Sequence, residues 1–154
     1  MSVKPNCVFC DMPAIKERAL IKNDLAWAFL TNIPITSGHT LISPVRCVES
    51  FEDMTSEEKA AVFELRDTLI PVLKKVFGAE GFHFAWNEGK VACQNVPHFH
   101  LHVVPRKKGD EGITEAEPRK FLYRPGSRED SPEAELRKVA EMIQSGFGKK
   151  NHPK

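Results

Sequence analysis

The segment QNVPHFHLHVVPR (Gln94–Arg106) holds three histidines at alternate positions, although the whole chain has only six. In a β-strand, side chains two positions apart lie on the same face. The segment therefore predicts a strand, PHFHLHVVPR, with His98, His100 and His102 on one face. The opposite, apolar face would comprise Phe99, Leu101 and Val103 and would belong to the core. Core packing explains the apolar residues, but it does not explain the row of histidines.

The surrounding sequence predicts an α+β fold, in which one long helix packs on an antiparallel sheet. Three further stretches have the composition and boundaries of strands: ALIKNDLAWAFL (19–30, two strands and a turn), GHTLISP (38–44) and GFHFAWN (81–87). The stretch MTSEEKAAVFELRDTLIPVLKKVFG (54–78) has the apolar spacing of a helix. Thr55 and Glu58 predict a capping box at its start, and Gly78 predicts its C-terminal end.

We expect one domain in residues 1–130, followed by a C-terminal helix in 131–146 and a flexible tail in 147–154. The helix would have Ser131 as its N-cap and Pro132 as its first residue. The chain of 154 residues is long enough to bury a core without covalent cross-links.

Composition narrows the class of protein and its partners. With 22 basic and 21 acidic residues the net charge is +1, so we expect neither nucleic acid nor membrane as a partner. The first residues lack the apolar stretch of a signal peptide, which makes the cytoplasm the expected location. In that reducing compartment the four cysteines, Cys7, Cys10, Cys47 and Cys93, are expected to be thiols or metal ligands.

Two chemical roles compete for the histidine row. In the first, all three rings bind one metal ion, but His98 and His102 would lie roughly 13 Å apart along a strand. Zinc–nitrogen bonds are only about 2 Å long, so this role is disfavoured for the full set. In the second, one ring attacks a phosphorus or acyl centre while its neighbours stabilise the developing charge. An imidazole with a pKa of about 6.5 is neutral and nucleophilic at physiological pH.

The motif HFHLHVV (98–104) resembles the signature of the histidine triad (HIT) family, in which histidines alternate with apolar residues. Further similar stretches follow the family's order: CVFC (7–10), AFLTNIPITSGHTLISP (28–44), the long helix and NEGKVACQNVPHFHLHVVPR (87–106). The resemblance covers about residues 5–106 and implies a nucleotide hydrolase or nucleotidyltransferase that acts at the α-phosphate, with purine nucleotides as expected substrates. It also implies a homodimer.

The resemblance implies a role for each histidine of the row. His100 would be the nucleophile that becomes nucleotidylated, and water would then release a nucleoside monophosphate. The backbone carbonyl of His98 would fix the tautomer of His100, and His102 would donate a hydrogen bond to the phosphate. His39 would support the site from the neighbouring strand, and no catalytic metal is implied. The implied nucleotide-binding residues are Asn32, Asn87, Gln94, Asn95 and His102.

Two positions depart from the family's pattern. Thr31 stands where members commonly have Asp or Asn to bind the ribose, and the adjacent Asn32 is expected to compensate. Asn95 stands directly after Gln94, where many members have Ser or Thr. An amide can donate a hydrogen bond but cannot relay a proton. We therefore hypothesise a preference for polyphosphate leaving groups over amines, which need protonation.

Cys7-x-x-Cys10 has the spacing of half a zinc site, although a redox pair or two buried thiols are alternatives. A subset of the HIT family binds structural zinc through this pair, a histidine after the third strand and the first histidine of the triad. Cys47 occupies the third-strand position here. The resemblance therefore implies a structural Zn²⁺ held by Cys7, Cys10, Cys47 and His98.

Two other function classes remain open from the sequence. One is a nucleotide-binding sensor or scaffold with the same fold and little turnover. The other is a metal-dependent enzyme that uses the histidine strand as ligands.

Overall fold

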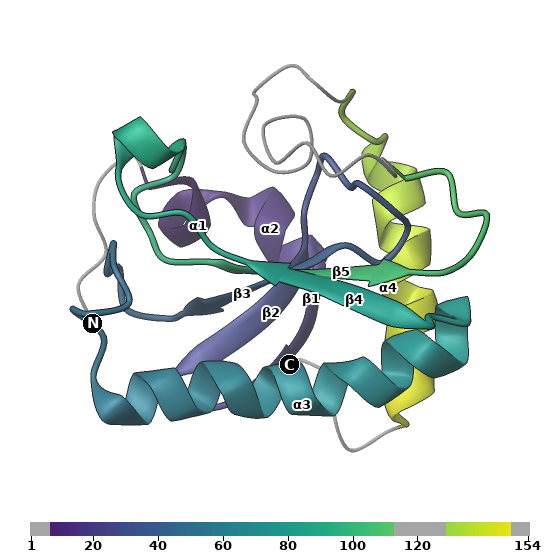
Figure 1. Ribbon diagram of the computed structural model, residues 1–154, viewed down its shortest axis with the longest axis horizontal. Coiled ribbons are helices and arrows are strands. Elements are labelled where there is room, and N and C mark those ends of the chain that lie inside the picture. Colours follow the sequence, from purple (N-terminus) through teal and green to yellow (C-terminus); the bar gives the residue numbers. More distant parts are fainter. Residues whose placement is uncertain (1–6, 113–128, 149–154) are drawn as a thin grey trace.

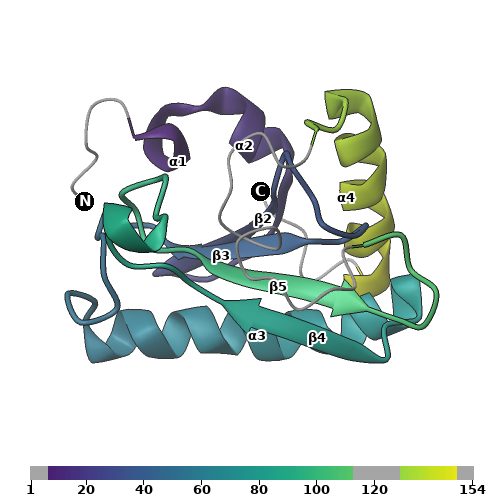
Figure 2. The same ribbon diagram turned by 45° about the horizontal axis from the view of Figure 1, so that its top comes forward.

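The computed structural model describes residues 7–112 and 129–148 and contains a five-stranded antiparallel sheet in the order β1-β2-β3-β5-β4. The strands are β1 (Ala19–Lys22), β2 (Ala26–Leu30), β3 (Thr40–Pro44), β4 (Gly81–Ala85) and β5 (Leu101–Arg106). The long helix α3 (Ser56–Phe77) lies along one face of the sheet, and the short helices α1 (Val8–Asp11) and α2 (Pro13–Glu17) lie over the other (Figures 1 and 2). The predicted α+β architecture is confirmed.

The turn between β1 and β2 is built by Asn23. Its side-chain oxygen accepts hydrogen bonds from the N–H groups of Leu25 (3.2 Å) and Ala26 (2.8 Å). Its amide nitrogen donates to the carbonyl of Ala61 in α3 (3.0 Å). One asparagine thus closes the hairpin and fixes it to the helix.

Helix α3 begins and ends as the sequence predicts. Thr55 and Glu58 form the capping box in both directions, and Gly78 ends the helix in the left-handed conformation (φ +67°). Glu58 is buried and forms an ion pair with Arg46, at 2.7 Å. The apolar side of α3 packs on the sheet, where it meets Phe99, Leu101 and Val103, each at most 1% exposed. The predicted assignment of these three residues to the core is confirmed.

The C-terminal helix α4 (Glu133–Phe147) begins later and ends later than the sequence predicts. Pro132 is its N-cap and makes no side-chain cap, whereas the N–H of Ser131 donates to the carbonyl of Asn32 (2.9 Å). Ser131 thus binds the β2–β3 connection through its backbone, and it is not the N-cap of the helix as the sequence predicts. Of the predicted tail, residue 147 is helical, and 149–154 lie outside the described residues.

Helix α4 runs upright across the end of α3 (Figure 1). Ala140 and Ile143 belong to the main hydrophobic core, and Gln144 donates to the carbonyl of Ala19 in β1 (2.8 Å). At Gly146 the two helices come so close that an added Cβ would lie 2.8 Å from Val72. The helix is therefore part of the same domain. Within residues 7–112 and 129–148, no helix is both long and apolar enough to cross a membrane.

The histidine strand is shorter than predicted, because β5 starts at Leu101 and not at Pro97. The backbone N–H of Phe99 donates to Val48 (2.7 Å), and the Ser43 hydroxyl donates to the Phe99 carbonyl (2.9 Å). These bonds replace the regular ladder, so His98, at the end of a bend, and His100 lie in the segment just before the strand, and His102 lies within the strand.

Candidate active site

The ring of His100 is held in one tautomer by the backbone. Its Nδ1 lies 2.8 Å from the carbonyl oxygen of His98, so Nδ1–H donates and Nε2 carries a lone pair. Burial lowers the pKa of His100 below the usual histidine value, although the hydrogen bond to the carbonyl acts in the opposite direction. The fixed tautomer and the net lowering of the pKa together leave a neutral imidazole with a nucleophilic Nε2.

His102 and His39 form a second, buried pair beside His100. The rings of His100 and His102 meet edge to face at a centroid distance of 5.1 Å. Nε2 of His39 lies 2.9 Å from Nδ1 of His102, and the N–H of Ile35 donates to Nδ1 of His39 (3.1 Å). His39 is fully buried, and His102 is 8% exposed. The sequence-predicted histidines 39, 100 and 102 are therefore brought together.

A cluster of sulfur and nitrogen donors lies at the start of the same segment. The ligand atoms of Cys7, Cys10, Cys47 and His98 all lie within 4.8 Å of one another. Nδ1 of His98 is 3.4 Å from the sulfur of Cys7 and 3.6 Å from that of Cys10. On the other side of the ring, Nε2 donates to the carbonyl of Pro44 (2.7 Å). This bond turns the Nδ1 lone pair toward the sulfurs, which is the tautomer a metal ligand requires.

The cluster is chemically suited to a metal ion. Burial, together with the neighbouring thiols of Cys7 and Cys10, raises the pKa of the Cys47 thiol to about 12. A divalent cation reverses this effect, because it binds thiolates directly. Three sulfurs and one imidazole nitrogen make a closed four-donor set. The four residues could therefore hold a metal ion, as the sequence predicted.

Phe9 links this cluster to His100. It lies between Cys7 and Cys10 in the chain, and its ring meets those of His98 (5.8 Å between centroids) and His100 (5.0 Å) edge to face. The position of the N-terminal segment thus affects the surroundings of the candidate nucleophile directly.

The loop before the histidine segment is fixed by its own polar side chains. Both ends of the Gln94 amide are occupied: the oxygen accepts from Gly89 N–H (2.7 Å), and the nitrogen donates to the Glu49 carbonyl (2.9 Å). Asn87 donates to the carbonyl of Cys93 (3.3 Å), which adopts the left-handed conformation (φ +65°). Gln94 therefore shapes this loop through both of its polar groups.

The chain's family is decided by comparison with known proteins. Residues 13–109 match the family model of the HIT domain. The protein belongs to the HIT family. It is 35% identical over 110 residues to an uncharacterized HIT-like protein of Mycoplasma genitalium, with 70% of this chain and 78% of that protein covered.

Two HIT relatives from Schizosaccharomyces pombe carry enzyme names. An asymmetrical bis(5'-nucleosyl)-tetraphosphatase is 34% identical over 96 residues, which cover 62% of this chain and 53% of that protein. An adenosine 5'-monophosphoramidase is 29% identical over 116 residues, which cover 70% of this chain and 80% of that protein. Among solved structures, a Zn-bound histidine triad family protein from Mycobacterium smegmatis matches with a TM-score of 0.71 and 27% identity. The match covers 92% of this chain and 93% of that one.

The position at which HIT members commonly bind the ribose has an unexpected environment. The hydroxyl of Thr31 accepts a hydrogen bond from Ile33 N–H (3.3 Å). The backbone carbonyl of the exposed Asn32 accepts one from the N–H of Ser131, two residues before α4. A cavity of about 70 Å³ next to them is lined by residues that include His39, Ser131 and Glu135. The segment before α4 and the first part of that helix thus lie next to Thr31.

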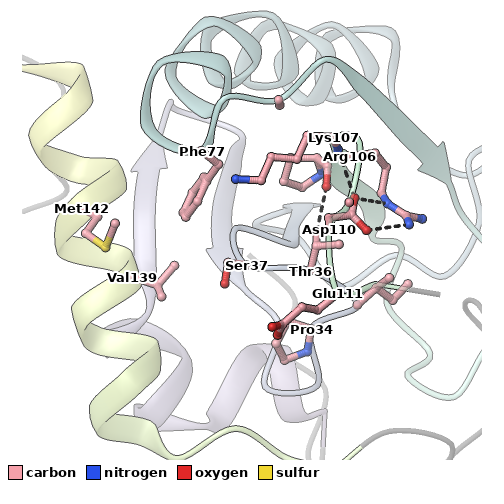
Figure 3. Close-up of a pocket in the computed structure, with 14 residues that line it drawn as sticks. Pro34, Thr36, Ser37, Phe77, Arg106, Lys107, Asp110, Glu111, Val139 and Met142 are labelled. Atoms are coloured by element: carbon pink, nitrogen blue, oxygen red, sulfur yellow. Dashed lines mark hydrogen bonds and ion pairs between the residues drawn. The ribbon is translucent and has the colours of Figure 1, made fainter. Parts of the chain in front are cut away.

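A larger cavity, of about 670 Å³, lies between β5 and α4 and contains none of the candidate catalytic residues. Figure 3 shows Phe77, Val139 and Met142 on its apolar side and the Arg106–Asp110 ion pair (2.9 Å) opposite them. Its wall also includes the turn Pro34–Ser37, which leads into His39.

Two contributors to the site were missed at the sequence level. One is Phe9, whose signal was its position inside the Cys7–Cys10 spacing. The other is the N–H of Ile35, which is a backbone group and has no signal in a sequence.

Proposed function

We propose that this HIT protein is a nucleotide hydrolase or nucleotidyltransferase that cleaves at the α-phosphate through a covalent nucleotidyl-His100 intermediate. The observation that carries the proposal is the 2.8 Å bond from His100 Nδ1 to the His98 carbonyl. It leaves Nε2 as the only ring nitrogen with a lone pair, in a neutral ring next to a hydrogen-bonding histidine.

The proposed reaction has two displacements at phosphorus. Nε2 of His100 attacks the α-phosphorus, and the bond to the leaving group breaks with its electron pair. His102 donates a hydrogen bond to a phosphoryl oxygen, where negative charge increases. Water or another acceptor then attacks the same phosphorus, releases the nucleoside monophosphate and restores His100. Asn32, Asn87 and Asn95 are the proposed direct contacts to the nucleotide, and Gln94 is proposed to hold the loop that carries two of them.

The choice of leaving group follows from Asn95. The two relatives with enzyme names differ in the leaving group of their substrates: one name specifies a phosphoanhydride and the other a phosphoramidate. An amine leaves only after protonation, and the exposed Asn95 carboxamide cannot relay a proton. We expect hydrolysis of purine dinucleoside polyphosphates to exceed that of a purine nucleoside phosphoramidate by about 10²-fold in kcat/KM.

Release of the nucleoside monophosphate from a panel of both substrate types tests this proposal. The variant Asn95→Ser should increase phosphoramidate turnover selectively, while the matched variant Asn95→Ala should not. Equal turnover of both types by the wild-type protein would refute the proposed preference. No turnover of any nucleotide would refute the proposed activity and favour a binding protein.

We propose zinc as the ion of the Cys7, Cys10, Cys47 and His98 cluster. The proposal is supported by the donor set and by the likeness to a histidine triad protein that is described as Zn-bound. Zinc there would supply a structural cross-link between the N-terminal segment, the end of β3 and the segment of His98. The reaction itself proceeds through His100 and His102.

We also propose that the protein is a homodimer formed through β4 and α3. Strand β4 is an edge of the sheet, and Phe84 (43%) and Trp86 (37%) are exposed on it or next to it. Sedimentation equilibrium should give twice the chain mass, and Phe84→Glu should shift it toward the monomer. A monomer at micromolar concentration in the wild type would contradict the proposal.

A further inference from the structure

We infer that the backbone N–H of Ile35, acting through His39, fixes His102 as a neutral Nε2–H donor that cannot protonate the leaving group. His39 is then a positioning residue. The inference deepens the proposed function and rests on it for its kinetic consequence: the substrates are those whose leaving group departs as an anion, such as a phosphate or a nucleotide.

The direction of the hydrogen bonds follows from the amide. A backbone N–H can only donate, so Nδ1 of His39, 3.1 Å away, must present its lone pair. The single proton of the neutral His39 ring is then on Nε2, and it is donated to Nδ1 of His102 at 2.9 Å. The proton of His102 must therefore be on its Nε2. The reverse direction would leave His39 without a proton on either nitrogen, as an imidazolate.

The same bonds oppose a second proton on either ring. On His39 it would have to enter at Nδ1, which faces the N–H of Ile35, and on His102 at Nδ1, which faces the N–H of His39. Either added proton would make two N–H groups point at each other and would put a positive charge on a ring in a buried site. His39 is fully buried, and His102 is 8% exposed. Both rings are therefore held neutral.

The turn that carries the Ile35 amide is held in place. The hydroxyl of Thr36 donates to the carbonyl of Pro105 in β5 (2.8 Å), as Figure 3 shows, and the N–H of His39 donates back to the carbonyl of Thr36 (3.1 Å). Gly38 has a φ of +90°, and an added Cβ there would lie 2.7 Å from the ring of Phe77. Gly38 therefore packs closely against Phe77, and the two hydrogen bonds tie the turn with the Ile35 amide to β5 and to His39.

The chemical consequence concerns the bond that breaks. When Nε2 of His100 forms its bond to phosphorus, the bond to the leaving group breaks and its electrons remain on the leaving atom. If His102 gave up its Nε2 proton, it would become an imidazolate, because His39 has no further proton to pass on. His102 therefore keeps its proton and stabilises the phosphoryl oxygen. A phosphate leaving group accepts the electrons as an anion, whereas an amine does not.

The first test measures the tautomer in the ligand-free protein, independently of any activity. Nitrogen–proton correlation spectra of isotope-labelled histidine should show His102 neutral at pH 7, with Nε2 protonated and Nδ1 not. In His39→Gln, whose amide N–H can replace the Nε2–H of His39, this signature should be retained. In His39→Leu it should become a mixture of tautomers. A charged His102, or an Nδ1–H tautomer in the wild type, would overturn the inference.

The second test measures the kinetic consequence. His39→Leu should lower kcat by about 10²-fold with a smaller change in KM, and His39→Gln should restore most of that loss. Across nucleoside 5'-phosphate esters with progressively less acidic leaving groups, the wild-type rate should fall steeply. A flat dependence would show that the leaving group is protonated and would overturn the inference. Absence of turnover with every ester would instead refute the proposed function, and the tautomer measurement would still decide the positioning role.

Discussion

Replacing His100 by alanine is expected to lower kcat/KM for a nucleotide substrate by at least about 10³-fold. The proposed nucleophile is the Nε2 of this ring, and methyl offers no atom that can form a bond to phosphorus. The neighbouring rings of His39 and His102 are hydrogen-bonded to one another, whereas the His98 carbonyl orients the ring of His100. Steady-state release of the monophosphate measures the loss.

The control for this variant is His83→Ala. His83 lies on the exposed side of β4 and is not among the candidate site residues, so its loss should leave kcat/KM within about twofold of the wild type. Because His100 is only half-buried, the thermal midpoint of His100→Ala should stay close to that of the wild type. Retention of a tenth or more of the activity by a folded His100→Ala variant would contradict the account.

The second large effect is expected at the metal cluster. Cys47→Ser should reduce bound zinc from about one ion per chain to near zero and lower the free energy of unfolding by several kcal/mol. Cys47 is buried and shares the donor set with Cys7, Cys10 and His98, so the remaining three ligands cannot close a four-coordinate site. For a chain of this size, that loss corresponds to a decrease in Tm of about 10 °C.

The matched control is Cys93→Ser. Cys93 is the one cysteine outside the donor set, and it lies in the loop next to Gln94. Its replacement should leave the zinc content at the wild-type level, measured by elemental analysis of purified protein. Because Phe9 lies between the cluster and His100, Cys47→Ser should also lower kcat. Equal metal content and equal Tm in Cys47→Ser and the wild type would rule out the proposed site.

Much of the fold could be predicted because local patterns and tertiary packing agree. The alternation at Phe99, Leu101 and Val103 predicted which face is buried, and the capping box at Thr55 marked the start of α3. The boundaries of β5 could not be predicted in the same way. The residues around His98 have the alternating side-chain pattern of a strand. The backbone groups of Phe99, however, bond to the Val48 carbonyl and the Ser43 hydroxyl instead of to a neighbouring strand's ladder. Only the tertiary structure determines such partners.

The candidate site was predictable where side chains alone define it. The four metal donors were expected from spacing and resemblance, and the structure brings them together. The roles that depend on backbone groups could not be predicted, and the N–H of Ile35 is the main example. Ser131 is a similar case, because a serine before a helix usually caps it, whereas here its N–H binds the β2–β3 connection. Long-range docking overrides the local preference.

The proposed reaction passes through a transient bond between Nε2 of His100 and phosphorus. The most direct measurement mixes equimolar protein and a dinucleoside polyphosphate, quenches the reaction within milliseconds and determines the mass of the intact protein. We expect a population heavier by one nucleotidyl group, with the added group mapped to the His100 peptide and absent in His100→Ala. Monophosphate release by the wild type without any such adduct, or with the adduct on another residue, would contradict the proposed reaction.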